Sequence, residues 1–274
     1  LNGSADFDVY DDLAIGVGGE WRTTDRTGSA LEVSSEEVLD GWGRVQFRPS
    51  GYLGIVAKGG VEERDPDRYD VNVAAGFGQN PLMRKFNQAY RYRSYGELLT
   101  NVAIGSLPLS LGASVFYGDD SYLQSDLGLD SGLDRRYGVD LNWTVNEKIA
   151  AYAMLGREKI DSRTRGSRTF TTADWVGRAE DDFETIQEVL FGVRGKKIGV
   201  NLDYSYGAGN SRMRITGAGD GIFPVVKSEL SSFKAGVTYG FSERTDLRLT
   251  WWYETLKTSD CSYNAQPAAM PTVL

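Results

Sequence analysis

The sequence contains no histidine and a single cysteine among its 274 residues. The lack of histidine excludes Ser-His-Asp and Cys-His nucleophilic sites and any zinc site that needs imidazole. It also excludes covalent c-type haem within the chain, because attachment requires C-x-x-C-H. Cys261 has no partner for an intrachain disulfide. We therefore predict that the chain is not an enzyme and that it carries no cofactor or metal ion of its own.

Long apolar runs are also missing. No stretch of 18 apolar residues occurs, so no transmembrane helix is predicted. A barrel strand escapes this test, since it needs only about ten alternating residues. The opening residues LNGSADFDVYDD lack the basic and apolar regions of a signal peptide, so the sequence is expected to start inside a larger protein. The net charge of −8 argues against a nucleic-acid partner.

The segment from Ser231 to Lys257 is typical of a β-hairpin with one apolar face. Two stretches of strict alternation flank the polar turn 242–245, and a period of two places each set of side chains on its own face of a sheet. The apolar set ends in aromatic residues, as expected of the girdle at a membrane interface. Its members are Ala235, Val237, Tyr239, Phe241, Leu247, Leu249, Trp251 and Tyr253.

Similar hairpins recur along the chain and predict about twelve strands of roughly ten to fifteen residues. Longer polar segments separate them, at about 24–36, 65–83, 120–133, 163–181, 209–229 and 258–274. Short turns at one end and long loops at the other are the arrangement of outer-membrane barrels. The predicted hairpins cover about 2–23, 37–64, 85–119, 134–162, 183–208 and 231–257.

The fold predicted from this pattern is all-β, an antiparallel transmembrane β-barrel, with residues 1–274 forming one barrel domain that is incomplete at both ends. A soluble β-sandwich or propeller is the alternative, because it would alternate too. Its buried face would be rich in Ile, Val, Leu and Phe, whereas the faces opposite the apolar sets here carry Gly, Ser, Asn, Asp, Arg and Lys, which cannot fill a dry core.

For several local motifs we favour a structural explanation over a binding or catalytic site. Gly16-Val17-Gly18-Gly19 lies inside an alternating strand, so glycine on the lumen face is favoured over a nucleotide-binding loop. Carboxylates such as Asp203 and Glu254 are interpreted as charges that line a water-filled lumen. Two acidic groups fit no calcium-loop template and are interpreted as solvated loops. They are Asp119, Asp120, Asp126, Asp130 and Asp134, and Glu180, Asp181, Asp182 and Glu184.

From residue 80 onward, the order of several blocks resembles the MtrB/PioB family of decahaem-associated outer-membrane proteins. The blocks include NPLMRKFNQAYRYRSYGE, LPLSLGASVFYGDDSYLQSDLGL, IGVNLDYSYGAGNSR and FPVVKSELSSFKAGVTYGFSERTDLRLTWWYE. Two features of the family are absent, a Cys-x-x-Cys near the mature N-terminus and the aromatic-ended closing strand. The resemblance therefore implies a fragment from the C-terminal part of such a barrel.

The resemblance implies a function in the bacterial outer membrane. The barrel would sheathe and position a periplasmic multihaem c-type cytochrome, often with a second multihaem cytochrome at the outer surface, as a conduit for extracellular electron transfer in metal reduction or iron oxidation. The haem would belong to the partner. Expected lumen-facing residues are Asp140, Asn142, Asn201, Asp203, Arg248 and Glu254, with Lys58 as a further candidate. Expected lipid-facing residues are Leu109, Leu111, Val115, Val200, Leu202, Leu247, Leu249 and Trp251.

Two other functions remain open at this point. A general diffusion porin or outer-membrane transporter would have the same wall around an open lumen. A soluble β-rich binding module would stay in solution without detergent. The direction of electron flow and the identity of the cytochrome are not encoded in any recognisable pattern.

Overall fold

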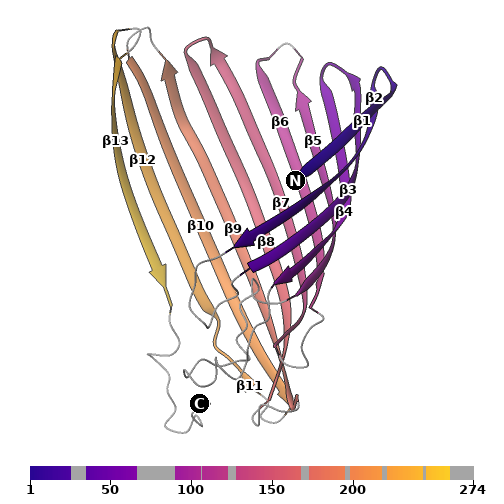
Figure 1. Ribbon diagram of the computed structural model, residues 1–274. Coiled ribbons are helices and arrows are strands. Elements are labelled where there is room, and N and C mark those ends of the chain that lie inside the picture. The colour runs from indigo at the N-terminus through magenta and orange to yellow at the C-terminus, as the bar shows by residue number, and fades with distance from the viewer. Residues whose placement is uncertain are drawn as a thin grey trace.

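A computed structural model describes residues 1–25, 35–66, 90–105, 107–122, 128–167, 173–194, 198–217, 221–242 and 245–259. They form one antiparallel sheet in which each strand pairs with the next along the chain, and the two-residue strand β11 pairs with β10 beside this path (Figure 1). The strands are β1 (Asn2–Tyr10), β2 (Leu13–Asp25), β3 (Ser35–Ser50), β4 (Leu53–Pro66), β5 (Arg91–Ala103), β6 (Leu109–Ser121), β7 (Gly128–Asn146), β8 (Ile149–Gly166), β9 (Trp175–Arg194), β10 (Ile198–Gly217), β11 (Gly221–Ile222), β12 (Val226–Ser242) and β13 (Thr245–Thr258).

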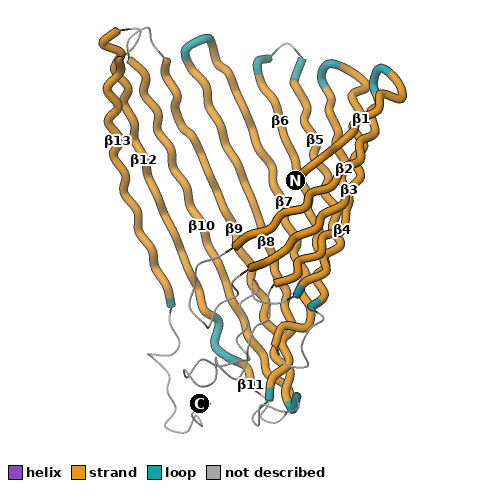
Figure 2. The backbone as a smooth tube through the Cα atoms, in the orientation of Figure 1, coloured by secondary structure: helices purple, strands orange, loops and turns teal. Residues whose placement is uncertain are grey.

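The sheet curls into a barrel wall rather than lying flat. The short connections between paired strands, among them 11–12, 51–52 and 147–148, gather at the upper end in Figure 2, and the strand ends that longer segments of the sequence separate lie at the opposite end. This confirms the all-β barrel predicted from the alternation. In the described part of the chain, no helix has the length and apolarity needed to cross a bilayer.

The two faces of the sheet differ in exposure and polarity. On β6, Val115 and Tyr117 are 42% and 49% exposed, whereas Gly112, Gly118 and Asp120 on the alternate positions are buried. Side chains converge on the concave side of a curved sheet and splay apart on the convex side, so the less exposed set lies on the concave side. We call the face of Gly112, Gly118 and Asp120 the inner face and the face of Val115 and Tyr117 the outer face.

The strands β7 to β10 are longer than the sequence predicted. They span 18 to 20 residues each, whereas β5 and β6 span 13. The polar segments 120–133, 163–181 and 209–229, predicted as loops, are thus partly strand, and that prediction was wrong in extent. The reason is that cross-strand ion pairs, such as those of Asp130 with Arg163 and Arg165, support strands whose exposed positions are charged.

Candidate lumen-facing surface

The residues predicted to face the lumen share the inner face. One row of paired residues connects β7 to β13 and runs from Asp140 through Met154, Gln187, Ser205 and Ser232 to Glu254. The other predicted residues lie at even spacings from this row on their own strands. They are Asn142 on β7, Asn201 and Asp203 on β10, and Arg248 on β13.

The residues predicted to face lipid share the outer face. Val200 pairs with Val237, which pairs with Leu249, and Leu202 is linked in the same way to Trp251 through Ala235. The remaining members occupy equivalent positions. Leu109, Leu111 and Val115 pair with Trp143, Leu141 and Tyr137, and Leu247 pairs with Tyr239. The register therefore keeps the two predicted sets on opposite faces of the sheet.

Aromatic side chains on the outer face of β12 and β13 form two groups. Tyr239 and Phe241 pack edge to face near the short turn, with ring centroids 4.8 Å apart. Further along, Trp251 stacks with Tyr253 at 6.3 Å and meets Phe233 edge to face at 5.6 Å. Eight residues separate Phe233 from Phe241, which is about 26 Å along a strand and about 20 Å along the barrel axis at a typical tilt. The two aromatic groups are therefore somewhat closer together than the roughly 25 Å height of the apolar band between the girdles of a barrel.

Glycines on the inner face make room for large side chains from the adjacent strand. A Cβ added to Gly18 would collide with the Trp42 indole, and one added to Gly112 would collide with the carboxylate of Asp140. At Gly16 the space is filled by Asp6, whose carboxylate accepts two hydrogen bonds of 2.7 Å from the Arg44 guanidinium, two strands away. These glycines therefore let polar and aromatic groups lie flat along the wall.

An inner ionic cluster occupies the long-loop end of β4 to β8. Its members are Glu62, Arg91, Arg93, Asp120, Asp134, Arg136 and Glu158. Arg93 donates to both carboxylate oxygens of Asp120, at 2.6 and 2.8 Å, and Arg136 bridges Asp134 and Glu158 at 2.6 and 2.9 Å. Asp120 and Asp134 are each only 4% exposed. Side chains can remain charged when buried if they are paired in this way. The cluster therefore links neighbouring strands through ion pairs between their side chains.

Next to the cluster, Lys58 lies between two aromatic rings on the inner face. Its ammonium is 5.0 Å from the Trp42 ring centroid and 5.4 Å from that of Tyr95. The Tyr95 hydroxyl donates to Asp40 at 3.0 Å. Such contacts hold a cation against the wall while it remains accessible from the concave side. The inner face is therefore polar and ordered, and not a dry core.

The acidic groups interpreted as solvated loops lie instead on strands, opposite basic side chains. Asp130 accepts from Arg163 at 3.1 Å and from Arg165 at 2.6 Å, and Asp182 accepts from Arg157 at 2.7 Å. Asp126 falls outside the described residues. Among the residues that are described, no group of three or more His, Cys, Asp or Glu side chains is arranged to hold a metal ion.

The sequence alone did not predict the inner ionic cluster or the charged outer face of β7 to β10. Both depend on which residues face each other across neighbouring strands. The one available signal was the recurrence of charged residues at alternate positions, as in Arg157, Lys159, Asp161 and Arg163.

Comparison with known proteins gives matches to a family model, a curated relative and a solved structure. A family model described as "Putative outer membrane beta-barrel porin, MtrB/PioB" matches residues 1–274. "Outer membrane protein MtrB" of Shewanella baltica (strain OS185) is 24% identical over 262 residues, which cover 94% of this chain and 37% of that protein. The chain thus spans little more than a third of the length of this relative. The ferric yersiniabactin uptake receptor FyuA from Yersinia pestis aligns with 93% of this chain and 52% of its own at 11% identity and a TM-score of 0.48.

The antiparallel sheet, its apolar outer face and the match over all 274 residues agree, and they place the protein in the outer membrane. The chain belongs to the MtrB/PioB family of outer-membrane β-barrel proteins.

Proposed function

We propose that this chain is part of a barrel that encloses a periplasmic multihaem c-type cytochrome and so forms an electron conduit across the outer membrane. The observation that carries the proposal is the family match along the whole chain, which extends the resemblance found in the sequence. In this function the wall insulates and positions the cytochrome and catalyses no reaction. The haem groups belong to the partner, which carries the electrons.

The polarity of the wall supports this function. Hydrocarbon would not solvate the polar surface of a cytochrome, whereas a barrel offers lipid an apolar exterior and its contents a polar interior. The inner face carries both signs of charge, from Asp140 and Asp203 to Arg248 and Lys58. Mixed charge and exposed amides such as Asn201 can contact a folded protein or its hydration water at many points.

The second candidate is a diffusion porin with an open lumen, since "porin" is part of the family description and the inner face suits water equally well. The two functions differ in what fills the barrel. A conduit requires a stoichiometric haem protein, whereas a porin conducts ions and small solutes on its own.

Affinity purification of the full-length protein from its native membrane, under mild detergent, tests the proposal. Haem staining and absorbance should reveal a cytochrome in about equal amount, and photo-crosslinkers at position 201 should reach it while crosslinkers at position 200 should not. A barrel that purifies without haem protein and gives steady ion conductance in planar bilayers would establish the porin instead.

A further inference from the structure

The outer face of β7 to β10 changes character along the strands. Near the short turns it carries apolar residues such as Val139, Leu155 and Ile198, which are 51–57% exposed. Beyond Tyr137 and Leu155 the same face becomes charged, beginning with Arg135 and Arg157. Lipid tails cannot cover charged side chains at this density. The change therefore marks the edge of the apolar band, and the rest of these strands projects beyond it on the long-loop side.

The charged rows next to this edge neutralise one another. Arg157 pairs with Asp182 at 2.7 Å, and Lys159 pairs with Glu180. Arg135 pairs with Asp161, and Arg212 pairs in the sheet register with Glu180. These residues and Glu184 occupy the three rows of β7 to β10 that lie next to the edge. The rows contain four basic and four acidic side chains, namely Arg135, Arg157, Lys159 and Arg212, and Asp161, Glu180, Asp182 and Glu184.

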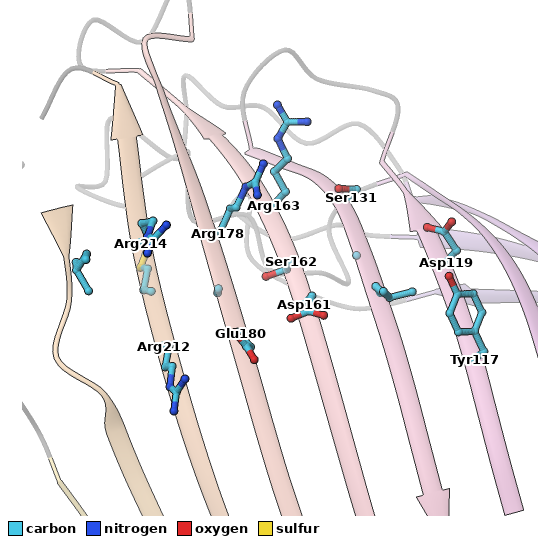
Figure 3. A pocket seen from close by; sticks show the side chains of 15 residues that line it. Tyr117, Asp119, Ser131, Asp161, Ser162, Arg163, Arg178, Glu180, Arg212 and Arg214 are labelled. Atoms are coloured by element: carbon cyan, nitrogen blue, oxygen red, sulfur yellow. The ribbon is translucent and has the colours of Figure 1, made fainter. Parts of the chain in front are cut away.

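The next row away from the membrane is not neutralised. It places three arginines directly opposite one another, because Arg163 pairs with Arg178 and Arg178 pairs with Arg214. Figure 3 shows them on adjacent strands, with Asp161, Glu180 and Arg212 in the row below. We call Arg163, Arg178 and Arg214 the arginine row. Like charges in opposed positions destabilise a sheet, so the repulsion among the three arginines lowers the stability of the sheet, and a bound counter-ion would remove this repulsion.

Asp130 contacts one end of the row, through Arg163 at 3.1 Å and Arg165 at 2.6 Å. Neither the Arg178 nor the Arg214 side chain forms an ion pair or hydrogen bond with another residue in the part of the chain that the structure describes. Both side chains are exposed. The row lines a half-open cavity of about 710 Å³, together with Ser131, Arg212 and Asp119. Two exposed guanidinium groups are thus available to an anion from outside the chain.

The height of the row indicates which anion it can reach. Arg163 follows Leu155 by eight residues, which is about 26 Å along a strand and about 20 Å along the barrel axis at a typical tilt. A phospholipid headgroup layer adds only about 5–8 Å to each side of the hydrocarbon. An anionic group that meets the row must therefore stand well above the acyl chains. Long loops mark the extracellular end of a barrel, so the surrounding leaflet is the external one.

We propose that the arginine row binds the phosphorylated inner-core sugars of the outer-leaflet glycolipid, lipopolysaccharide. Arginine matches phosphate with paired N–H donors, and the headgroup of this lipid reaches the required height. Arg178 and Arg214 bind the phosphate groups, and Arg163 contributes charge while it remains tied to Asp130. The rows below the arginine row carry no net charge, so they do not repel the approaching lipid.

The test uses the full-length protein in detergent and a rough lipopolysaccharide that retains its phosphorylated inner core. Its affinity is measured for the wild type, for R163Q/R178Q/R214Q and for the matched control R157Q/D182N, which removes an ion pair from the same face outside the cavity. We expect the triple variant to bind about 100-fold more weakly, from roughly fivefold per basic residue lost, and the control to bind within threefold of the wild type.

Equal affinity of the wild type and the triple variant would overturn the proposal. So would equal binding of the same lipopolysaccharide after removal of its phosphate esters, or equally good binding of phosphatidylglycerol. Displacement by millimolar inorganic phosphate would show a site for free anions instead. If the triple variant does not fold, the wild type decides: its affinity for the phosphorylated lipid must fall steeply between 50 and 500 mM NaCl, and a flat profile refutes the assignment.

Discussion

Arg93 and Asp120 face each other across β5 and β6 and form a two-point ion pair, with Nε–Oδ1 and Nη2–Oδ2 distances of 2.6 and 2.8 Å. Asp120 is 4% exposed, and Arg91 lies 3.9 Å from the same carboxylate. Arg91 is also paired with Glu62, whereas Asp120 is the one acid that pairs with Arg93 among the described residues. The stability of this corner of the barrel depends on that acid, because its loss leaves positive charge without compensation in a poorly hydrated place.

The first prediction follows from this pair. Asp120→Ala should lower the free energy of unfolding by about 3–5 kcal/mol, the usual cost of breaking a buried ion pair from one side. Denaturant unfolding of the full-length protein in detergent measures it. The double variant Arg93→Ala/Asp120→Ala should lose less than the sum of the single variants. Additive losses would show that the pair is not coupled.

A second prediction concerns the close approach of Trp42 to Gly18 on the inner face. Gly18→Val should destabilise the barrel by about 1–3 kcal/mol, because the valine side chain would collide with the Trp42 indole and displace it from its place across residue 18. Gly43→Val is the matched control, since nothing lies within 4 Å of a Cβ at Gly43. Denaturation midpoints of the two variants give the comparison. Equal midpoints would mean that the indole does not lie across Gly18.

A third prediction tests the assignment of the two faces with adjacent residues. In a background with Cys261→Ser, Asn201→Cys should react with a membrane-impermeant maleimide when the barrel holds only water, and more slowly when its partner is bound. Val200→Cys should react with a lipid-soluble maleimide and be quenched by spin-labelled lipid. If position 201 were accessible to lipid and position 200 to water, the side chains of β10 would lie on the opposite faces from those given by the register described above.

The fourth prediction is a pH dependence of the outer charged rows. The hydrogen bond from Lys159 lowers the pKa of Glu180 below its ordinary 4.5, and the one from Arg157 lowers the pKa of Asp182 below 3.8. Groups with a lowered folded pKa stabilise the protein above their unfolded pKa, and that contribution disappears as the pH falls through the folded pKa.

Wild type should therefore unfold at a slightly higher denaturant concentration than Glu180→Gln/Asp182→Asn at pH 6, and at the same concentration near pH 2. The difference will be small, because these side chains are solvated. It should also shrink in high salt. A gap that persists at pH 2 would point to packing and not to charge as its source.

Much of the fold was predictable because strands in a barrel wall obey a period of two. Alternation identified the hairpins and separated residues such as Asn201 from Val200 onto different faces. The rule breaks at a register shift between β8, β9 and β10. Gln187 pairs with Ser205 on the inner face and Val193 pairs with Val200 on the outer face, although six residues separate them. An extra residue in one strand reverses the alternation, and a single sequence does not show where it occurs.

The ends of the long strands could not be predicted for a different reason. At Arg163 and Arg165, charged residues stand where an apolar set would continue in the membrane, so the sequence predicted a loop from residue 163 onward. Both arginines form ion pairs with Asp130 on β7, and that pairing exists only once the chain is folded. The division of residues between the two faces of the sheet was therefore accessible from the sequence, whereas the inner ionic cluster and the arginine row were not.

The nearest-neighbour order of the strands has a consequence for how such walls diversify. Apart from β11, each strand pairs only with strands adjacent to it on the chain. A duplication or deletion of one hairpin at a short turn leaves the path of every other strand unchanged, and it preserves which side each residue faces. Since barrel diameter grows with strand number, the bore of such a wall can change in steps of two strands.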